Sequence, residues 1–148
     1  MTHAAVQPSP QPGSLASRLG PAKAVVVVED DNDIARFMRA YLRASGFAVT
    51  CVAPREVADV LQVVQAETPV CVLLDHNLGH GMLSGDVLTA LRGLATPPPV
   101  IIVSGDASLK RHELLAAGAA EFVPKPFSAK RLAALIIAVA DREPIPVG

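Results

Sequence analysis

Short runs of consecutive apolar, mostly β-branched residues recur along this chain and restrict its fold more than any other feature of the sequence. Three of them, Val25–Val28, Val70–Leu74 and Val100–Val103, contain no charged or hydrogen-bonding side chain apart from a cysteine. Such runs are typical of strands buried on both faces, as in a parallel sheet covered by helices. With two partly polar runs, the predicted strands are Ala24–Val28, Phe47–Val52, Val70–Leu74, Val100–Val103 and Glu121–Val123.

Amphipathic stretches separate these strands. Apolar residues at helical spacing predict helices around residues 34–42, 54–64, 87–91, 109–117 and 128–139. The first is expected to bury Phe37 with its other apolar residues, Pro54 to open the second at its first position, and Ser128 to cap the last. The order predicts an α/β fold, a (βα)5 doubly wound, five-stranded parallel sheet with its chemistry beyond the carboxyl ends of the strands.

Composition predicts one domain with two short ends. The chain has 148 residues, of which 51% are apolar, which is enough for a single core. Residues 1–21, rich in Pro, Ser and Gln, are interpreted as a flexible leader, residues 22–141 as the domain and residues 142–148 as a short tail. We expect no output segment after Asp141.

Charge and hydropathy argue against several partners. The 13 basic and 14 acidic residues give a net charge of -1, so no whole-chain field favours nucleic acid. The longest apolar run, Leu132–Ala140, is far shorter than the ~20 residues of a membrane-spanning helix. No secretory signal is recognisable, so we expect a cytoplasmic protein in which Cys51 and Cys71 are buried, unpaired thiols.

Polar side chains follow the predicted strands at their carboxyl ends. Glu29 and Asp30 follow the first strand, Asp75 the third, Ser104 the fourth and Lys125 lies just beyond the fifth. Two carboxylates about 4 Å apart repel by about 4 kcal/mol at an effective dielectric constant of 20, so such a cluster calls for a cation. Mg2+ prefers oxygen ligands, and a carboxylate in such a clamp can accept a phosphoryl group. The sequence therefore predicts a metal-assisted phosphoryl site.

Four motifs at these strand ends carry a family resemblance. They are Glu29-Asp30 after an apolar run, the segment 73–78, Val103-Ser104-Gly105 and Lys125-Pro126-Phe127. Together they resemble the receiver domain of two-component response regulators, of the single-domain type seen in chemotaxis regulators, over about residues 23–141. The resemblance implies a flavodoxin-like fold with strand order 2-1-3-4-5 and a signalling role rather than an enzymatic one.

The resemblance also implies a role for each residue at the centre of the site. Asp75 would be the phosphoacceptor, and Mg2+ would bind Glu29, Asp30, Asp75 and the backbone carbonyl of Asn77. Lys125 would contact the phosphoryl group, before a proline that the family usually joins by a cis bond. The phosphodonor would be a sensor histidine kinase or a histidine-phosphotransfer protein.

The remaining implied roles concern switching and lifetime. Ser104 would be the switch hydroxyl and Phe122 the switch aromatic, whose movement changes the contact with a downstream protein. Asn77 and Asp106 would tune the loss of the phosphate, because they flank the path of the attacking water.

The chain departs from the family pattern after the acceptor. The family usually has a proline where this chain has Gly79, and the segment Asp75–Gly85 is about two residues longer than the commonest form. His76 and His80 in this segment have zinc-like spacing, but no third ligand is in view, and we interpret both as exposed.

Other readings stay open at this stage. The chain could be the receiver module of a hybrid kinase, or a receiver-like interaction domain that is never phosphorylated. A remote alternative is an aspartyl-phosphate hydrolase of the haloacid-dehalogenase type, for which Asp31-Asn32-Asp33 offers the D-x-D motif. We interpret Asp31 as the start of a helix.

Overall fold

Five strands and five helices alternate in the computed structural model, which describes residues 22–142. The predicted leader (1–21) and most of the predicted tail (143–148) lie outside the described residues. The elements are β1 (Ala24–Val28), α2 (Asn32–Ala44), β2 (Ala48–Val52), α3 (Val57–Glu67), β3 (Cys71–Asp75), α4 (Ser84–Arg92), β4 (Val100–Ser104), α5 (Arg111–Ala116), β5 (Glu121–Pro124) and α6 (Ala129–Ala140).

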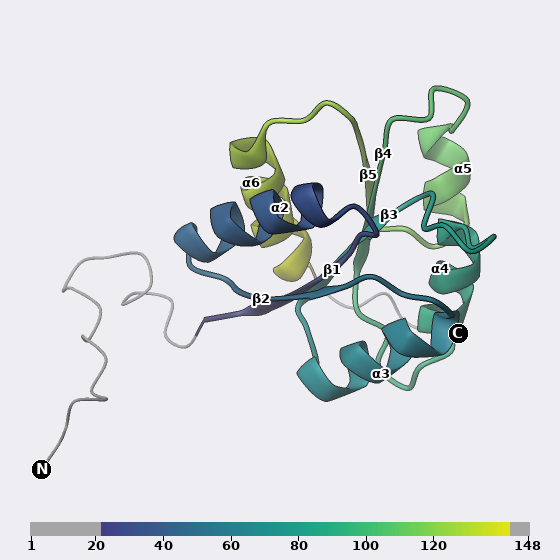
Figure 1. Cartoon of the computed structure of the whole chain (residues 1–148), viewed down its shortest axis with the longest axis horizontal. Helices are drawn as coiled ribbons and strands as arrows, with labels where there is room; N and C mark the ends of the chain where they lie inside the picture. Colours follow the sequence, from purple (N-terminus) through teal and green to yellow (C-terminus); the bar gives the residue numbers. More distant parts are fainter. Residues whose placement is uncertain (1–21, 143–148) are drawn as a thin grey trace, which may run out of the picture.

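All five strands are parallel and lie in the order β2-β1-β3-β4-β5 (Figure 1). The predicted α/β fold and strand order are therefore confirmed. The chain starts in the middle of the sheet, moves out to β2 and returns past β1 to β3. Beyond the carboxyl ends of β1 and β3, where the direction of winding reverses, the connecting loops leave room for a site.

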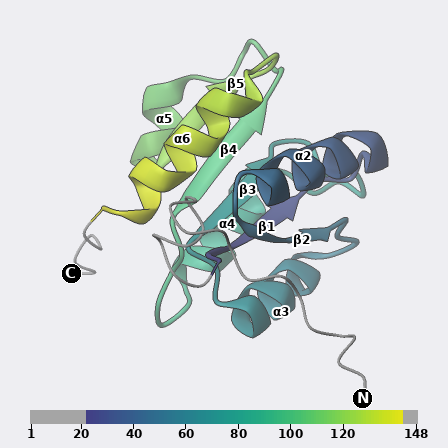
Figure 2. The same ribbon diagram turned by 90° about the vertical axis from the view of Figure 1, so that its left-hand side faces the viewer.

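The two faces of the sheet have separate cores, because successive side chains of a strand point to opposite sides. Val25 and Val27 pack with α2 and α6, whereas Val26 and Val28 pack with α3, α4 and α5. Figures 1 and 2 show these helices as layers on the two faces of the sheet. Burying one such valine fully stabilises the fold by about 1.5–3 kcal/mol, so the apolar strands anchor the loops above them.

Three helix predictions are corrected by the structure. Phe37 is 57% exposed, because it lies about 120° around α2 from the direction shared by buried Met38 and Leu42. Pro54 does not open α3, which begins at Val57. The Asp59 carboxylate in its first turn accepts hydrogen bonds from the backbone N–H groups of residues 55 and 56, which caps the helix at this point. The fourth predicted helix, 109–117, shortens to α5, since residues 106–109 form a turn.

The structure also tests the predictions about the two cysteines and about membrane-spanning helices. Cys51 and Cys71 are both unpaired, but only Cys71 is fully buried, whereas Cys51 is half-buried. Among the helices of residues 22–142, none combines the length and the apolar character that crossing a membrane requires.

Candidate functional site

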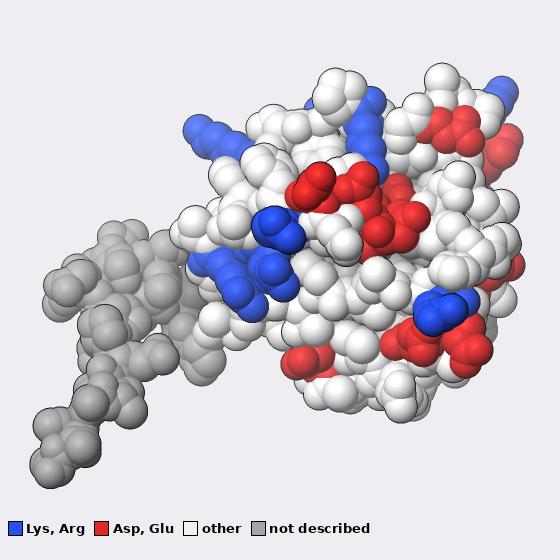
Figure 3. Space-filling model, viewed as in Figure 1, with Lys and Arg blue, Asp and Glu red and all other residues white. Residues whose placement is uncertain are grey.

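Three carboxylates meet where β1 and β3 end. Glu29 directly follows β1, and Asp75 is the last residue of the neighbouring β3. Together with Asp30, these residues bring one carboxylate oxygen each within 4.8 Å of one another. Figure 3 shows acidic side chains gathered over this part of the sheet. The prediction that these carboxylates come together is confirmed.

Lys125 is the cation that faces the cluster. It follows β5, and its backbone N–H donates to the Ser104 carbonyl, which ties it to the end of β4. Its Nζ lies 3.5 Å from Oε1 of Glu29 and 3.4 Å from Oδ1 of Asp75, with the lysine side chain 25% exposed. The Lys125–Pro126 peptide bond is cis, as the resemblance implied.

Glu29 shows the electrostatic cost of this arrangement. Burial, followed by the negative charge of Asp75, raises the pKa of Glu29 to about 7, while the Asp31 backbone N–H and Lys125 act in the opposite direction. A single lysine therefore does not fully compensate the three carboxylates. The site is suited to an additional cation, and a set of oxygen donors on adjacent strand ends is what Mg2+ prefers.

The predicted switch hydroxyl and its neighbour lie at the end of β4. Ser104 is buried, and its Oγ accepts a hydrogen bond of 3.0 Å from the backbone N–H of Asp106. The Asp106 carboxylate is exposed and accepts from the hydroxyl and the backbone N–H of Ser108, which together lower its pKa. Ser104 thus has a partner on its own loop in this state.

Phe122 lies on β5, opposite Ile102 of β4 in the sheet register. It is half-buried and packs on the core side that contains Leu114 and Leu115. On the same strand, Glu121 forms an ion pair with Arg111 of α5. The aromatic ring is therefore neither free in solvent nor fully enclosed.

The segment after Asp75 is where sequence reasoning missed most. It forms a hairpin in which Asn77 and Leu83 pair, around a turn with positive φ at Gly79, His80 and Gly81. A proline could not adopt the φ of 74° at Gly79, which accounts for the departure from the family pattern. His76, predicted to be exposed, is half-buried and hydrogen-bonded to Ser84, a residue that the sequence had not singled out.

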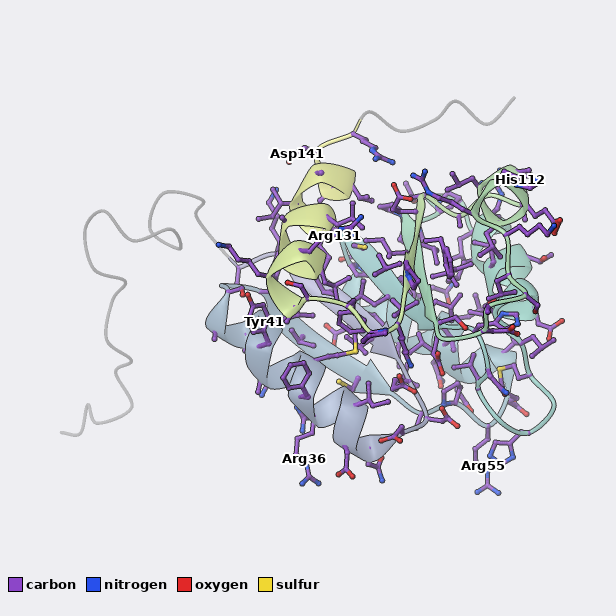
Figure 4. The ribbon with its side chains drawn as sticks, turned by 90° about the horizontal axis from the view of Figure 1, so that it is seen from above. Arg36, Tyr41, Arg55, His112, Arg131 and Asp141 are labelled. Atoms are coloured by element: carbon purple, nitrogen blue, oxygen red, sulfur yellow. The ribbon has the colours of Figure 1, made fainter. Side chains whose placement is uncertain are left out.

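Asp31 begins α2, as the sequence indicates, and His112 lies on the surface. Asp31 is the N-cap of α2, where its Oδ1 accepts from the backbone N–H groups of Asp33 and Ile34. That role accounts for the D-x-D motif without catalysis. His112 is exposed on α5, at the side of the molecule away from α2 and α6 (Figure 4).

Comparison with known proteins places these observations in a family. The family model described as the response regulator receiver domain matches residues 25–137. Regulatory protein VirG of Agrobacterium tumefaciens is 34% identical over 120 residues, which are 78% of this chain and 43% of VirG. Transcriptional regulatory protein PrrA of Mycobacterium bovis is also 34% identical over 120 residues, which are 80% of this chain and 50% of PrrA.

Solved structures agree with the sequence relatives. A CheY-like response regulator receiver domain protein from Methanospirillum hungatei superposes with a TM-score of 0.71 at 26% identity, covering 81% of this chain and 94% of that one. The chain spans about half the length of the curated relatives it matches, since it covers 43% of VirG and 50% of PrrA.

Proposed function

The chain belongs to the family of response regulator receiver domains, and from that membership we propose that Asp75 is the residue that receives the phosphoryl group. The single observation that carries the proposal is the convergence of the Glu29, Asp30 and Asp75 carboxylates with Lys125 beyond β1 and β3. Receiver domains are signalling modules, and residues 22–141 would form this one. We propose that this protein works in the cytoplasm and that its phosphodonor is a sensor histidine kinase or a histidine-phosphotransfer protein.

The chemistry is a transfer between two nucleophiles. A carboxylate oxygen of Asp75 attacks the phosphorus of a phosphohistidine, the P–N bond breaks, and the imidazole leaves with the electron pair and takes up a proton. Glu29, Asp30, Asp75 and the backbone carbonyl of Asn77 would hold Mg2+, which supplies charge neutralisation for the phosphoryl oxygens. Lys125 would then exchange its contact with Asp75 for one with the phosphoryl group.

The signal would leave the site through β4 and β5. If Ser104 Oγ turns from the Asp106 N–H toward the phosphoryl oxygens, it vacates space beside β5. Phe122 already lies half-buried on β5 and could rotate into that space. The surface made by α5, β5 and α6 would change shape and contact a downstream protein. Phosphorylation must favour the active state by ~3–5 kcal/mol for a minor population to become dominant.

Two functions of the whole protein are compatible with this site. The near-neutral charge favours output through a protein contact rather than through nucleic acid bound by these residues. The relatives are about twice as long as the matched region, and one of them is called a transcriptional regulatory protein. The second candidate is accordingly a receiver module that controls an output domain in a longer protein.

Incubation with acetyl phosphate and MgCl2, followed by intact mass measurement, tests the assignment. We expect the wild type to gain the mass of one phosphoryl group. The Asp75→Asn variant should gain none, and neither should the wild type in the presence of EDTA. Glu113→Gln is a matched control, because Glu113 is an exposed carboxylate in the first turn of α5 and should leave the reaction unchanged. Phosphate gain that survives in Asp75→Asn would refute Asp75 as the acceptor.

A further inference from the structure

The hairpin of residues 76–84 is closed by two hydrogen bonds between the same two residues. The Ser84 backbone N–H donates to the His76 carbonyl at 2.8 Å, and Nδ1 of His76 lies 2.7 Å from Oγ of Ser84. Either side chain can donate in the second bond, according to the imidazole tautomer. Ser84 is 1% exposed, so its hydroxyl needs a protein partner, and among the described residues His76 is that partner.

This closure determines where the Asn77 backbone points. The hairpin bonds run from Ser84 to the His76 carbonyl and from the Leu78 N–H to the Met82 carbonyl, on either side of the Asn77–Leu83 pair. In an antiparallel pair of this kind the central residues do not exchange hydrogen bonds, and their N–H and C=O groups point away from the opposite strand. The hairpin therefore leaves the Asn77 carbonyl available on its outer side.

The hairpin is also fixed against the acidic cluster. A Cβ atom added at Gly79 would lie 3.5 Å from Oδ2 of Asp30, so the turn packs beside that carboxylate. The side chains of Leu78 and Met82 are buried in the core on the α3–α4 side of the sheet. The hairpin is thus held at its turn beside Asp30 and at its sides by Leu78 and Met82, and the His76–Ser84 pair joins its two ends.

We propose that the His76–Ser84 pair positions the Asn77 carbonyl beside Asp75 and thereby sets the Mg2+ affinity of the site. The inference rests on the proposed function in taking Asp75 and the Asn77 carbonyl as metal ligands. His76 and Ser84 are positioning residues, since they act through the backbone of the residue between them and the metal. Mg2+ demands near-ideal octahedral geometry, whereas Ca2+ accepts a flexible shell, so a misplaced carbonyl should affect Mg2+ more.

Titration of the full chain with MgCl2 and with CaCl2, followed by calorimetry and amide chemical shifts, tests the proposal. Ser84→Ala and His76→Leu each remove the side-chain hydrogen bond, and we expect Mg2+ binding about tenfold weaker, as when groups that orient a metal ligand are lost. Ca2+ binding should weaken much less. His76→Asn places an amide where Nδ1 lies and should restore most of the Mg2+ affinity.

His80→Asn is the matched control. It removes an imidazole from the exposed tip of the same hairpin, at a φ of 52° that asparagine tolerates, and should leave Mg2+ affinity unchanged. Wild-type Mg2+ affinity in Ser84→Ala and His76→Leu would overturn the inference, as would equal weakening for both ions or no rescue by asparagine. A wild-type protein that does not bind Mg2+ would instead overturn the proposed function, and this inference with it.

Discussion

Replacing Lys125 by methionine removes the only cation that the described residues place against the acidic cluster. Its Nζ lies 3.5 Å from Glu29 and 3.4 Å from Asp75. At an effective dielectric constant of 20, each of these attractions amounts to about 5 kcal/mol before desolvation is counted. Methionine has nearly the same length and shape but no charge, so the substitution leaves the carboxylates to repel one another.

The expected loss is smaller than these two attractions suggest. The Lys125 side chain is 25% exposed, so water screens part of its charge. Glu29, with a pKa of about 7, is only partly ionised at neutral pH. After these discounts and the recovered desolvation of the ammonium group, we expect a loss of about 2 kcal/mol, below the ~3–5 kcal/mol typical of breaking a fully buried pair. The melting temperature should fall by about 6–10 °C.

Thermal unfolding followed by circular dichroism, at neutral pH in EDTA, measures this loss. Lys130→Met is the matched control. Lys130 is an exposed lysine on α6, so this variant should have the same melting temperature as the wild type. Excess MgCl2 should raise the melting temperature of Lys125→Met more than that of the wild type, since the metal then supplies the missing positive charge. If Lys125→Met melts with Lys130→Met in EDTA, the electrostatic reasoning for the site is wrong.

Three further predictions concern the hairpin, the β5 ion pair and the phosphate. Leu78→Ala should lower the free energy of unfolding by about 2–5 kcal/mol in urea, because Leu78 is fully buried, and a loss under about 1 kcal/mol would contradict the anchoring. Although burial raises the pKa of Glu121, its bonds to Arg111 and the Phe122 N–H lower it overall. Glu121→Gln should therefore destabilise at neutral pH, and the deficit should vanish as the pH falls through the lowered pKa; a pH-independent deficit would count against it. If Asp75 is the acceptor, a double Asn77→Leu, Asp106→Leu variant should lengthen the phosphate lifetime several-fold by mass measurement, because apolar side chains exclude the attacking water; unchanged decay would rule this out.

The sequence by itself determined the class of fold and the place of the site. Runs such as Val25–Val28 indicate burial on both faces of a strand, because every side chain of the run is apolar. This conclusion does not require knowing which distant segment covers them. Parallel strands align their carboxyl ends, so residues that follow the strands, such as Glu29 and Asp75, had to lie at one edge. Local periodicity and one rule of sheet geometry were sufficient for these conclusions.

Only the tertiary structure decided which side chains become buried and which segments contact one another. Phe37 has the helical spacing of the apolar residues around it. It is exposed nevertheless, because the surface that α2 buries is too narrow to include it. The segment after Asp75 has glycines and histidines that are compatible with many loops. Its hairpin brings His76 into a hydrogen bond with the buried hydroxyl of Ser84, eight residues further along the chain. Such contacts are set by packing between elements, and no local pattern of residues encodes that packing.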